Sequence, residues 1–322
     1  MRIVYMGTPA VASQPLRAIK AAGHDVLAVV CQPDRPKGRG KVVVPGEVKK
    51  AALEMGLDVL QPERAGEPRF IEELASLAPD AVVLMAYGQK IPKAALDIPR
   101  HGFINIHASI LPEYRGAAPV QRAIMDGRSS TGVTIMYMNE GMDEGDIGLV
   151  REIPILPDDD SGSLLDKVSS AGSELIIEML RLLDMGEAPR LPQDPSRASK
   201  AGKITRGDET IDWGRGKDEI VNLVRALAPD PGARTKLGGN EIKVLKAIAL
   251  DDDSAAGLGL PDHRPGLAFA GRDSSAYASA SDGWVEILQV RPSGGKTMDC
   301  RAFVRGRRLA GEVSTEYIAH VR

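Results

Sequence analysis

Three polar side chains near the middle of the chain could together carry out acyl transfer to an amine. The stretch from Phe103 to His107 reads FINIH, and this alternation predicts a strand with Asn105 and His107 on one face, near its carboxyl end. Asp143 follows in the glycine-bracketed turn GMDEGD, from which a carboxylate could reach the same point. A carboxamide can donate to a developing oxyanion, an imidazole can polarise the reacting group, and a carboxylate can hold or charge the imidazole.

Each of these features also has a structural interpretation. An Asn-x-His pair on a strand is more often part of a packed sheet than of a catalytic site. An aspartate in a glycine turn commonly serves the turn itself. The three residues alone are therefore compatible with either a catalytic or a structural role. The surrounding sequence is needed to distinguish the two.

The first half of the chain alternates short apolar runs with helical patterns. Continuous apolar strands separated by helices indicate a parallel sheet that is covered on both faces. We therefore expect a Rossmann-like doubly wound domain, whose ligands would bind beyond the carboxyl ends of the strands, where Asn105 and His107 lie. The expected strands are 2–6, 25–31, 58–60, 80–86, 103–107, 131–138 and 149–155, and the expected helices are 14–22, 47–55, 69–77, 120–125 and 163–185.

The composition is that of an ordinary globular protein. The 322 residues are 43% hydrophobic and 26% charged, which suffices for a full core and two domains. No apolar run approaches the length of a membrane span, and we expect neither a signal peptide nor a membrane partner. Cys31 and Cys300 stand far apart without metal-ligand spacing, so we expect no metal site and a cytoplasmic protein.

The first strand-to-helix turn limits the class of cofactor. It reads MGTP at 6–9 and has no G-x-G-x-x-G pattern, which disfavours a nicotinamide or flavin dinucleotide. The net charge of -3 means that any contact with nucleic acid has to come from local basic patches.

Residues 107–119, HASILPEYRGAAP, resemble the H-x-S-L-L-P-x-x-x-G signature of the folate-dependent formyltransferases. Ile110 replaces the more usual leucine, which is a mild departure. The resemblance also covers Asn105, two residues before the histidine, and Asp143 in an x-D-x-G-D pattern. It implies that Asn105, His107 and Asp143 are catalytic. It further implies that tetrahydrofolate contacts Ser109, Ile110, Leu111 and Pro112, and that a second loop, Tyr87, Gly88 and Gln89, lines the folate pocket mostly through backbone groups.

A second stretch carries charge in a loop rich in proline and glycine. Residues 32–41 read QPDRPKGRGK and would by default form a solvated loop. They resemble the loop Q-P-D-R-P-x-G-R-G-K of the methionyl-tRNA formyltransferases, which engages the acceptor arm of the tRNA. The resemblance assigns that role to Arg35, Lys37, Arg39 and Lys41, of which Arg39 is the best single candidate.

The composition and the hydrophobic pattern of the sequence change after residue 189. Residues 190–206 are basic and proline-rich, which indicates a linker that is solvated or lies along an RNA backbone. We expect a catalytic domain at 1–189 and a small β-barrel, OB-like, at 207–322 that contacts tRNA. It would contain a helix at 218–227, strands at 241–250, 267–270, 284–290 and 297–304, and phosphate-binding arginines Arg301, Arg305, Arg307 and Arg308.

The resemblance covers nearly the whole chain and implies transfer of the formyl group of 10-formyltetrahydrofolate to the amino group of initiator methionyl-tRNA, without a metal. Two alternatives remain open. One is a formyltransferase acting on a small amine, such as a ribonucleotide or an amino sugar. The other is a catalytically idle RNA-binding or folate-binding protein. A monomer is the default expectation.

Overall fold

The chain folds into two compact units. The structure is a computed structural model that describes residues 1–37 and 42–315. No helix in these ranges is both long and apolar enough to cross a membrane. The first unit comprises Met1–Pro119, Ser130–Pro154 and Leu165–Gly202, and the second comprises Val120–Ser129, Ile155–Leu164 and Lys203–Arg322.

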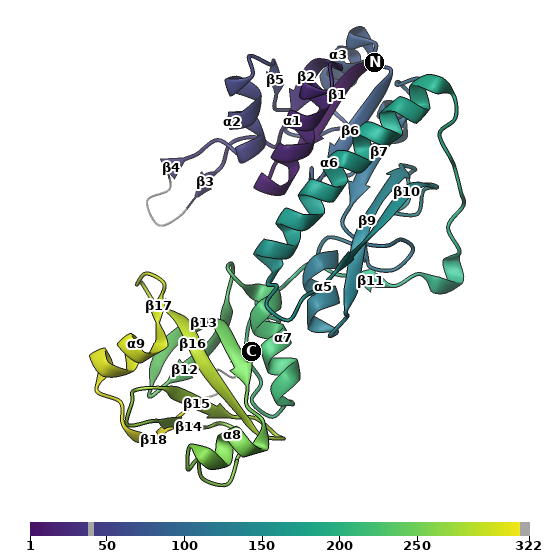
Figure 1. Ribbon diagram of the computed structural model, residues 1–322. Helices are drawn as coiled ribbons and strands as arrows, with labels where there is room; N and C mark the ends of the chain where they lie inside the picture. Colours follow the sequence, from purple (N-terminus) through teal and green to yellow (C-terminus); the bar gives the residue numbers. More distant parts are fainter. Residues whose placement is uncertain (38–41, 316–322) are drawn as a thin grey trace. The chain divides into compact units, whose positions relative to one another are not determined.

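A seven-stranded sheet forms the centre of the first unit (Figure 1). Its order is β10-β9-β7-β6-β1-β2-β5, and the strands from β7 to β5 are parallel, whereas β9 runs antiparallel to β7 and β10. The chain starts in the middle, builds outward to β5 and then crosses to the other side of β1, as in doubly wound folds. The strands are β1 (Arg2–Gly7), β2 (Asp25–Val30), β5 (Val59–Leu60), β6 (Ala81–Met85), β7 (Phe103–His107), β9 (Ser130–Tyr137) and β10 (Ile147–Pro154).

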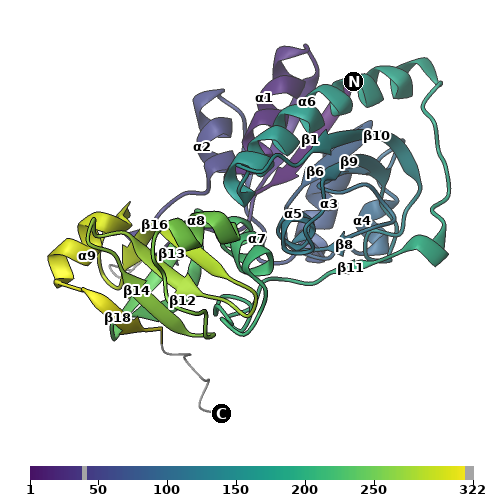
Figure 2. The ribbon, with the colours of Figure 1, turned by 60° about the horizontal axis from the view of Figure 1, so that its bottom comes forward.

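Helices cover both faces of this sheet, which explains the continuous apolar strands (Figure 2). On one face, α3 (Pro68–Leu77) and α4 (Lys93–Leu96) pack against the alternate residues of the strands, including Phe103. On the other face α6 (Ser161–Met185) approaches so closely that a Cβ at Gly172 would lie 2.8 Å from Ile106. The helices α1 (Ser13–Ala21) and α2 (Glu47–Glu54) lie on the same side as α6.

The second unit is built on an antiparallel sheet that curls into a half-barrel (Figure 1). Its core joins this sheet to α7 (Lys217–Leu227) and α9 (Cys300–Arg307), through apolar residues such as Val224, Val290 and Phe303. A third helix, α8 (Asp252–Gly257), is capped by the carboxylate of Asp251. The strands are, in spatial order, β12 (Ala233–Leu237), β13 (Asn240–Ala249), β16 (Trp284–Pro292), β15 (Ala276–Ser279), β14 (Leu267–Ala270) and β18 (Gly311–Ser314), with β17 (Met298–Asp299) paired to β16.

The predicted fold, a Rossmann-like domain followed by a small OB-like barrel, is confirmed, with one element wrong. Residues 297–304 were expected to form a strand, but only β17 is extended and α9 follows it. The Asp299 carboxylate accepts hydrogen bonds from the amides of Arg301 and Ala302, which caps the helix. Cys300, Phe303 and Val304 then occupy one buried helical face.

Short elements complete the chain. In the described part of the loop predicted to contact tRNA, β3 (Pro36–Lys37) pairs antiparallel with β4 (Val42–Val43), which follows that loop. The pair β8 (Arg115–Gly116) and β11 (Lys200–Ala201) joins the segment after β7 to the segment after α6. The remaining elements are α5 (Pro119–Met125) and the single turns η1 (Ala10–Ala12) and η2 (Pro195–Arg197).

An ion pair in the second unit makes a testable contribution to its stability. Asp208 accepts a hydrogen bond from the Arg122 guanidinium at 2.7 Å and two more from Thr205, and these bonds, the one from Arg122 first, lower the pKa of Asp208 from 3.8 to about 2. The folded-state pKa lies below the unfolded value, so this stabilisation is present above about pH 4 and is lost as the pH falls toward 2. We expect Asp208→Asn to destabilise the unit by about 2 kcal/mol at pH 7.

Denaturant unfolding of wild type and Asp208→Asn at several pH values measures this effect. The difference in unfolding free energy should shrink between about pH 4 and pH 2. Asp262→Asn, at an exposed carboxylate, is the matched control. A difference that persists unchanged at the lowest pH would contradict the assignment.

Candidate functional site

Strand β7 brings Asn105 and His107 together. Odd-numbered residues of β7 share one face, so Asn105 and His107 project on the same side as Phe103, the side covered by α3 and α4. Both polar side chains are buried, with exposed fractions of 7% and 5%. His107 is the last residue of the strand and lies opposite Thr134 of β9. The pair thus occupies the carboxyl end of a central parallel strand, as predicted.

The two nitrogens of the His107 imidazole have different partners. Nε2 lies 3.1 Å from the carbonyl oxygen of Tyr114, and because a carbonyl only accepts, Nε2 must carry a proton to make this bond. Nδ1 faces Asp143, with 3.7 Å between Nδ1 and Oδ1. The Nδ1 side is therefore the one on which the ring can exchange a proton or donate to a ligand.

Asp143 is held by the backbone of a neighbouring loop. Its Oδ2 accepts a hydrogen bond from the amide of Gly116 at 2.8 Å, which leaves Oδ1 toward His107. A separation of 3.7 Å exceeds a hydrogen bond, so the carboxylate acts on the ring by its charge or through a bridging water. The loops after β7 and β9 thus meet at one point, as the sequence predicted.

Two residues at this point have backbone conformations that cost free energy. Tyr114 has a φ of 58° and Asp143 a φ of 53°, both in the left-handed region that non-glycine residues rarely adopt. Each such residue costs on the order of 1–3 kcal/mol, and it persists only where surrounding contacts impose it. Both residues contact His107, one through its carbonyl and the other through its carboxylate.

The Asn105 carboxamide is available to a ligand. Within the described parts of the chain, it makes no hydrogen bond to another side chain or to the backbone, although it is 93% buried. Its polar atoms are not among the fully buried atoms that lack a partner, so they remain accessible to solvent and to a ligand. Its Nδ2 donors, close to the His107–Asp143 pair, suit an oxyanion.

The segment 109–112, predicted to contact folate, is fixed by internal hydrogen bonds. The Ser109 hydroxyl donates to the carbonyl of Glu113 at 2.6 Å, and Ser109 is fully buried. The Thr134 hydroxyl donates to the Ser109 carbonyl and accepts from the amide of Leu111. Leu111 and Pro112 are also buried, whereas Ile110 is partly exposed. Ile110 thus offers the most accessible side chain of the four.

The segment 87–89 follows β6 at the same edge of the sheet. The Tyr87 side chain is buried in the core, where desolvation raises its pKa to about 12 and its hydroxyl has no partner among the described residues. Gly88 has a φ of 88°, a conformation that favours glycine. Gln89 bonds to Gln32 and to the backbone at Ala65. These side chains hold neighbouring loops, which leaves mainly backbone groups to face a ligand.

Two of the four cations in the predicted tRNA-binding loop lie within the described residues. Arg35 is exposed and makes a 3.4 Å ion pair with Glu63, and such exposed pairs contribute little. Lys37 lies in β3, whereas Arg39 and Lys41 are outside the described residues. The start of the loop is well fixed because Lys49 Nζ donates to the Asp34 carboxylate at 2.5 Å, a bond that lowers the pKa of Asp34.

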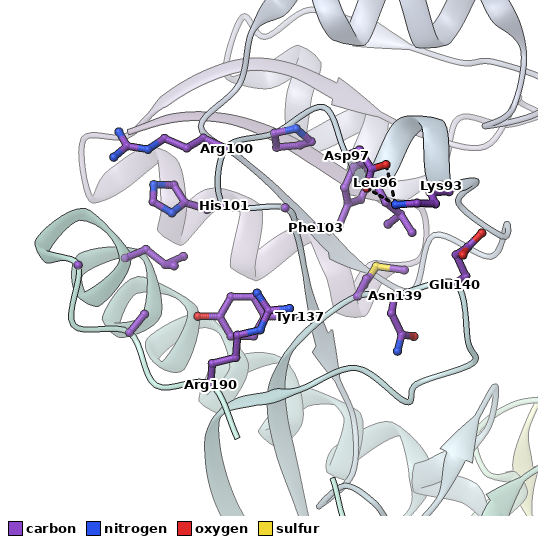
Figure 3. A pocket seen from close by; sticks show the side chains of 16 residues that line it. Lys93, Leu96, Asp97, Arg100, His101, Phe103, Tyr137, Asn139, Glu140 and Arg190 are labelled. Atoms are coloured by element: carbon purple, nitrogen blue, oxygen red, sulfur yellow. Dashed lines mark hydrogen bonds and ion pairs between the residues drawn. The ribbon is translucent and has the colours of Figure 1, made fainter. Parts of the chain in front are cut away.

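A cavity of about 590 Å³ lies at the opposite end of β7 (Figure 3). Phe103 lines it and shares the face of Asn105 and His107, four residues away from His107 along the strand. On one wall the Arg190 guanidinium stacks over the Tyr137 ring at 4.6 Å, and on another Lys93 pairs with Asp97. None of the residues assigned to the site by sequence lines this cavity.

Several side chains at the site were not identified from the sequence. Gln193 bonds to the Asp143 loop, Ser199 bonds to the amide of Tyr114, and the backbone amide of Gly116 bonds to Asp143 itself. Backbone donors and a linker carboxamide leave no spacing pattern that could identify them. In the described ranges, no group of three or more His, Cys, Asp or Glu residues could hold a metal ion.

Comparison with known sequences relates both units to one family. Residues 1–180 match the family described as formyl transferase, and residues 203–308 match the formyl transferase C-terminal domain. The methionyl-tRNA formyltransferase of Symbiobacterium thermophilum is 42% identical over 307 residues, which cover 95% of this chain and 92% of the relative. That of Heliobacterium modesticaldum is 42% identical over 315 residues, covering 96% and 98%.

Solved structures share the fold at lower identity. HypX from Aquifex aeolicus, in complex with tetrahydrofolic acid, matches 94% of this chain with a TM-score of 0.65 and 21% identity. The match spans only 47% of the HypX chain. An N-formyltransferase from Helicobacter canadensis, in complex with folinic acid and dTDP-3-aminofucose, has a TM-score of 0.65 at 16% identity, covering 88% of this chain and 98% of that one.

Proposed function

The chain belongs to the formyl transferase family, and we propose that it transfers the formyl group of 10-formyltetrahydrofolate to the amino group of methionyl-tRNA. The observation that carries this conclusion is 42% identity to methionyl-tRNA formyltransferases over 95% of the chain, through both units. The resemblance first read from residues 107–119 is thereby confirmed, together with the enzyme class and the folate donor.

We propose that Asn105, His107 and Asp143 carry out the reaction. When bound, 10-formyltetrahydrofolate supplies a formyl carbon that the methionyl amine attacks, and the carbon–nitrogen bond to the folate then breaks. Asn105 Nδ2 donates to the oxyanion that develops on the formyl oxygen, a role that its carboxamide, which has no hydrogen-bond partner among the described residues, suits. His107 acts from its Nδ1 side, because Nε2 is bound to the Tyr114 carbonyl.

Asp143 is assigned two effects on His107. Its carboxylate, 3.7 Å from Nδ1, positions the imidazole so that His107, together with Asn105, can stabilise the oxyanion. The same carboxylate can take up the proton that the attacking amine loses, directly or through a water, and that proton passes to the folate nitrogen as the carbon–nitrogen bond breaks. The bond from the Gly116 amide to Oδ2 keeps Oδ1 toward the imidazole during both steps.

The finer assignments rest on the sequence. We propose contacts to tetrahydrofolate from the segments 87–89 and 109–112, and contacts to the tRNA acceptor arm from Arg35, Lys37, Arg39 and Lys41. We also propose that the substrate is the initiator tRNA, that the enzyme is a cytoplasmic monomer, and that the second unit contacts tRNA. The exposed arginines of α9 and its end, Arg305, Arg307 and Arg308, support the last proposal.

Arg39→Ala is expected to raise the KM for methionyl-tRNA while leaving kcat at saturating tRNA near the wild-type value. A guanidinium that contacts a phosphate adds affinity and salt dependence, so the slope of log Kd against log salt should fall by about one in the variant. Steady-state kinetics and binding titrations at several salt concentrations measure both effects. Arg17→Ala is the control, because Arg17 pairs with Glu54 on the protein surface. An unchanged KM would remove Arg39 from the interface.

The function itself is tested by formyl transfer from 10-formyltetrahydrofolate to three acceptors. These are methionyl initiator tRNA, methionyl elongator tRNA and a panel of small amines that includes amino-sugar nucleotides and amino ribonucleotides. Transfer to initiator methionyl-tRNA alone is the expected result. Transfer to a small amine but not to tRNA would keep the chemistry and overturn the substrate. Binding of folate or tRNA without transfer to any acceptor would indicate a non-catalytic protein.

A further inference from the structure

Within the first unit, the chain after α6 lies against the loops that carry Asp143 and Tyr114. Residues 190–201, which we call the strap, follow α6 and end in β11 beside β8 (Figure 2). Leu191 exchanges backbone hydrogen bonds with Ile147 at 2.7 and 2.9 Å. At its other end the strap pairs with Arg115 and Gly116. A sequence of this composition would ordinarily form a solvated linker that makes few specific contacts.

Gln193 lies at the centre of these contacts. Its Oε1 accepts hydrogen bonds from Arg115 Nε at 3.1 Å and from Nη2 at 2.7 Å. Its Nε2 donates to the carbonyl oxygens of Asp143 at 2.9 Å and of Gly145 at 2.7 Å. One carboxamide thus joins the loop after β7 to the turn that carries Asp143. Both of its donors and both acceptor sites are used, which fixes its orientation.

Ser199 makes the corresponding contact on the His107 side. Its hydroxyl oxygen accepts from the amide of Tyr114 at 2.9 Å, while the carbonyl of the same tyrosine accepts from His107 Nε2. Ser199 also accepts at its own carbonyl from the amide of Arg115 at 2.8 Å. These bonds hold Tyr114 in its left-handed conformation and thereby place the carbonyl that orients the imidazole.

The strap lies very close to the backbone of the loop after β7 at Gly116. A Cβ at this position would lie 2.5 Å from the carbonyl oxygen of Ala201, and the φ of Gly116 is 129°. Only glycine allows the two backbones to come this close. The amide of the same residue donates to Asp143 Oδ2. The backbone that holds the catalytic carboxylate is therefore packed directly against the strap.

We propose that Gln193 and Ser199 are positioning residues, which set the relative placement of Asp143 and His107. Gln193 acts on Asp143 through its backbone carbonyl, and Ser199 acts on His107 through Tyr114. Neither residue contacts the reacting atoms in this account. The inference rests on the proposed function, because it assigns these residues a role in the reaction of that same pair.

Gln193→Ala tests the first half of the proposal. The change removes all four bonds and leaves the turn at Asp143 free to shift, and a displacement of about 1 Å at a catalytic group can cost on the order of 10²-fold in rate. We expect kcat to fall roughly 10- to 100-fold, with the KM values for methionyl-tRNA and for 10-formyltetrahydrofolate within about twofold of wild type. Gln193→Glu should lower kcat as well, because a carboxylate accepts from Arg115 but cannot donate to the two carbonyls.

Ser199→Ala tests the second half, and the strap provides its own control. We expect a loss in kcat of roughly 10-fold for Ser199→Ala and recovery in Ser199→Thr, which keeps a hydroxyl oxygen. Ser196→Ala is matched to it, because the Ser196 hydroxyl donates at 2.7 Å to Asp194 within the strap. That variant should keep the wild-type kcat. Thermal melting of every variant verifies that the protein folds.

The outcomes distinguish the proposed function from the positioning role of Gln193 and Ser199. Wild-type protein that formylates no acceptor would overturn the proposed function, whatever the strap does. An active wild type whose Gln193→Ala and Ser199→Ala variants keep kcat within twofold would overturn the positioning role alone. Equal losses in Ser199→Ala, Ser199→Thr and Ser196→Ala would also overturn it, since they would indicate a general requirement for the strap. If Gln193→Ala does not fold, Gln193→Glu and the Ser199 pair decide the question.

Discussion

His107→Ala is expected to lower kcat for formyl transfer by roughly 10²- to 10⁴-fold, the range that a general acid–base group commonly contributes. The imidazole is buried at 5% exposure, with Nε2 committed to a backbone carbonyl and Nδ1 facing a carboxylate. Its removal takes away a group that we propose stabilises the oxyanion. Because the imidazole adds little substrate-binding area, the KM values should change much less than kcat.

Single-turnover formylation of methionyl-tRNA under saturating folate measures this loss without interference from product release. His263→Ala is the matched control, because His263 is exposed in the second unit. Far-UV circular dichroism and thermal melting establish that His107→Ala folds. A variant that retains a rate within threefold of wild type would remove His107 from the mechanism.

Asn105→Asp is expected to lower kcat by roughly 10²- to 10³-fold, the usual cost of losing an oxyanion donor. The substitution keeps the size of the side chain but exchanges the NH₂ group for a carboxylate oxygen, which would repel a developing negative charge. The Asn105 side chain makes no hydrogen bond to the described residues, so few protein contacts are lost. Activity should therefore fall far more than stability.

The measurement is again the single-turnover rate, now with Asn105→Ala and Asn105→Asp together. Both should be slow, and Asn105→Asp should be at least as slow as Asn105→Ala if donation to an oxyanion is what the residue contributes. Asn222→Ala is the control, because Asn222 accepts a hydrogen bond from Arg225 in the second unit. A rate for Asn105→Asp close to that of wild type would contradict the assigned donor role.

The sheet and the pair on β7 could be predicted from local pattern. Buried parallel strands are continuously apolar, so strands such as β6 stand out in the sequence. Alternation at 103–107 placed Asn105 and His107 on one face, and the structure adds that Phe103 continues this face into the core. Whether these residues perform the assigned chemistry stays a prediction until the variants are measured.

The contacts that orient the pair could not be predicted, because they join distant parts of the chain through backbone groups. Gln193 reaches the carbonyl of Asp143 across 50 positions, and Ser199 reaches the amide of Tyr114 across 85. Every residue has a backbone carbonyl, and nearly every residue has a backbone amide. The sequence therefore does not mark which of them bonds to Gln193 or Ser199. The helix α9 was missed for a different reason, since eight residues are too few to separate helical from alternating periodicity.

The strap also constrains how the protein can be altered. Ordinary linkers tolerate insertions and deletions because their residues make no specific contacts. Here Gln193 and Ser199 each meet a fixed partner on the catalytic loops, so the number of residues between them is set by the distance they span. One residue added or removed between them would move one contact by about 2 Å even along a 3-10 turn such as η2, which lies between them, and this is more than a hydrogen bond can accommodate. If Asn105, His107 and Asp143 act as proposed, the spacing within this segment is as constrained as the residues of the site themselves.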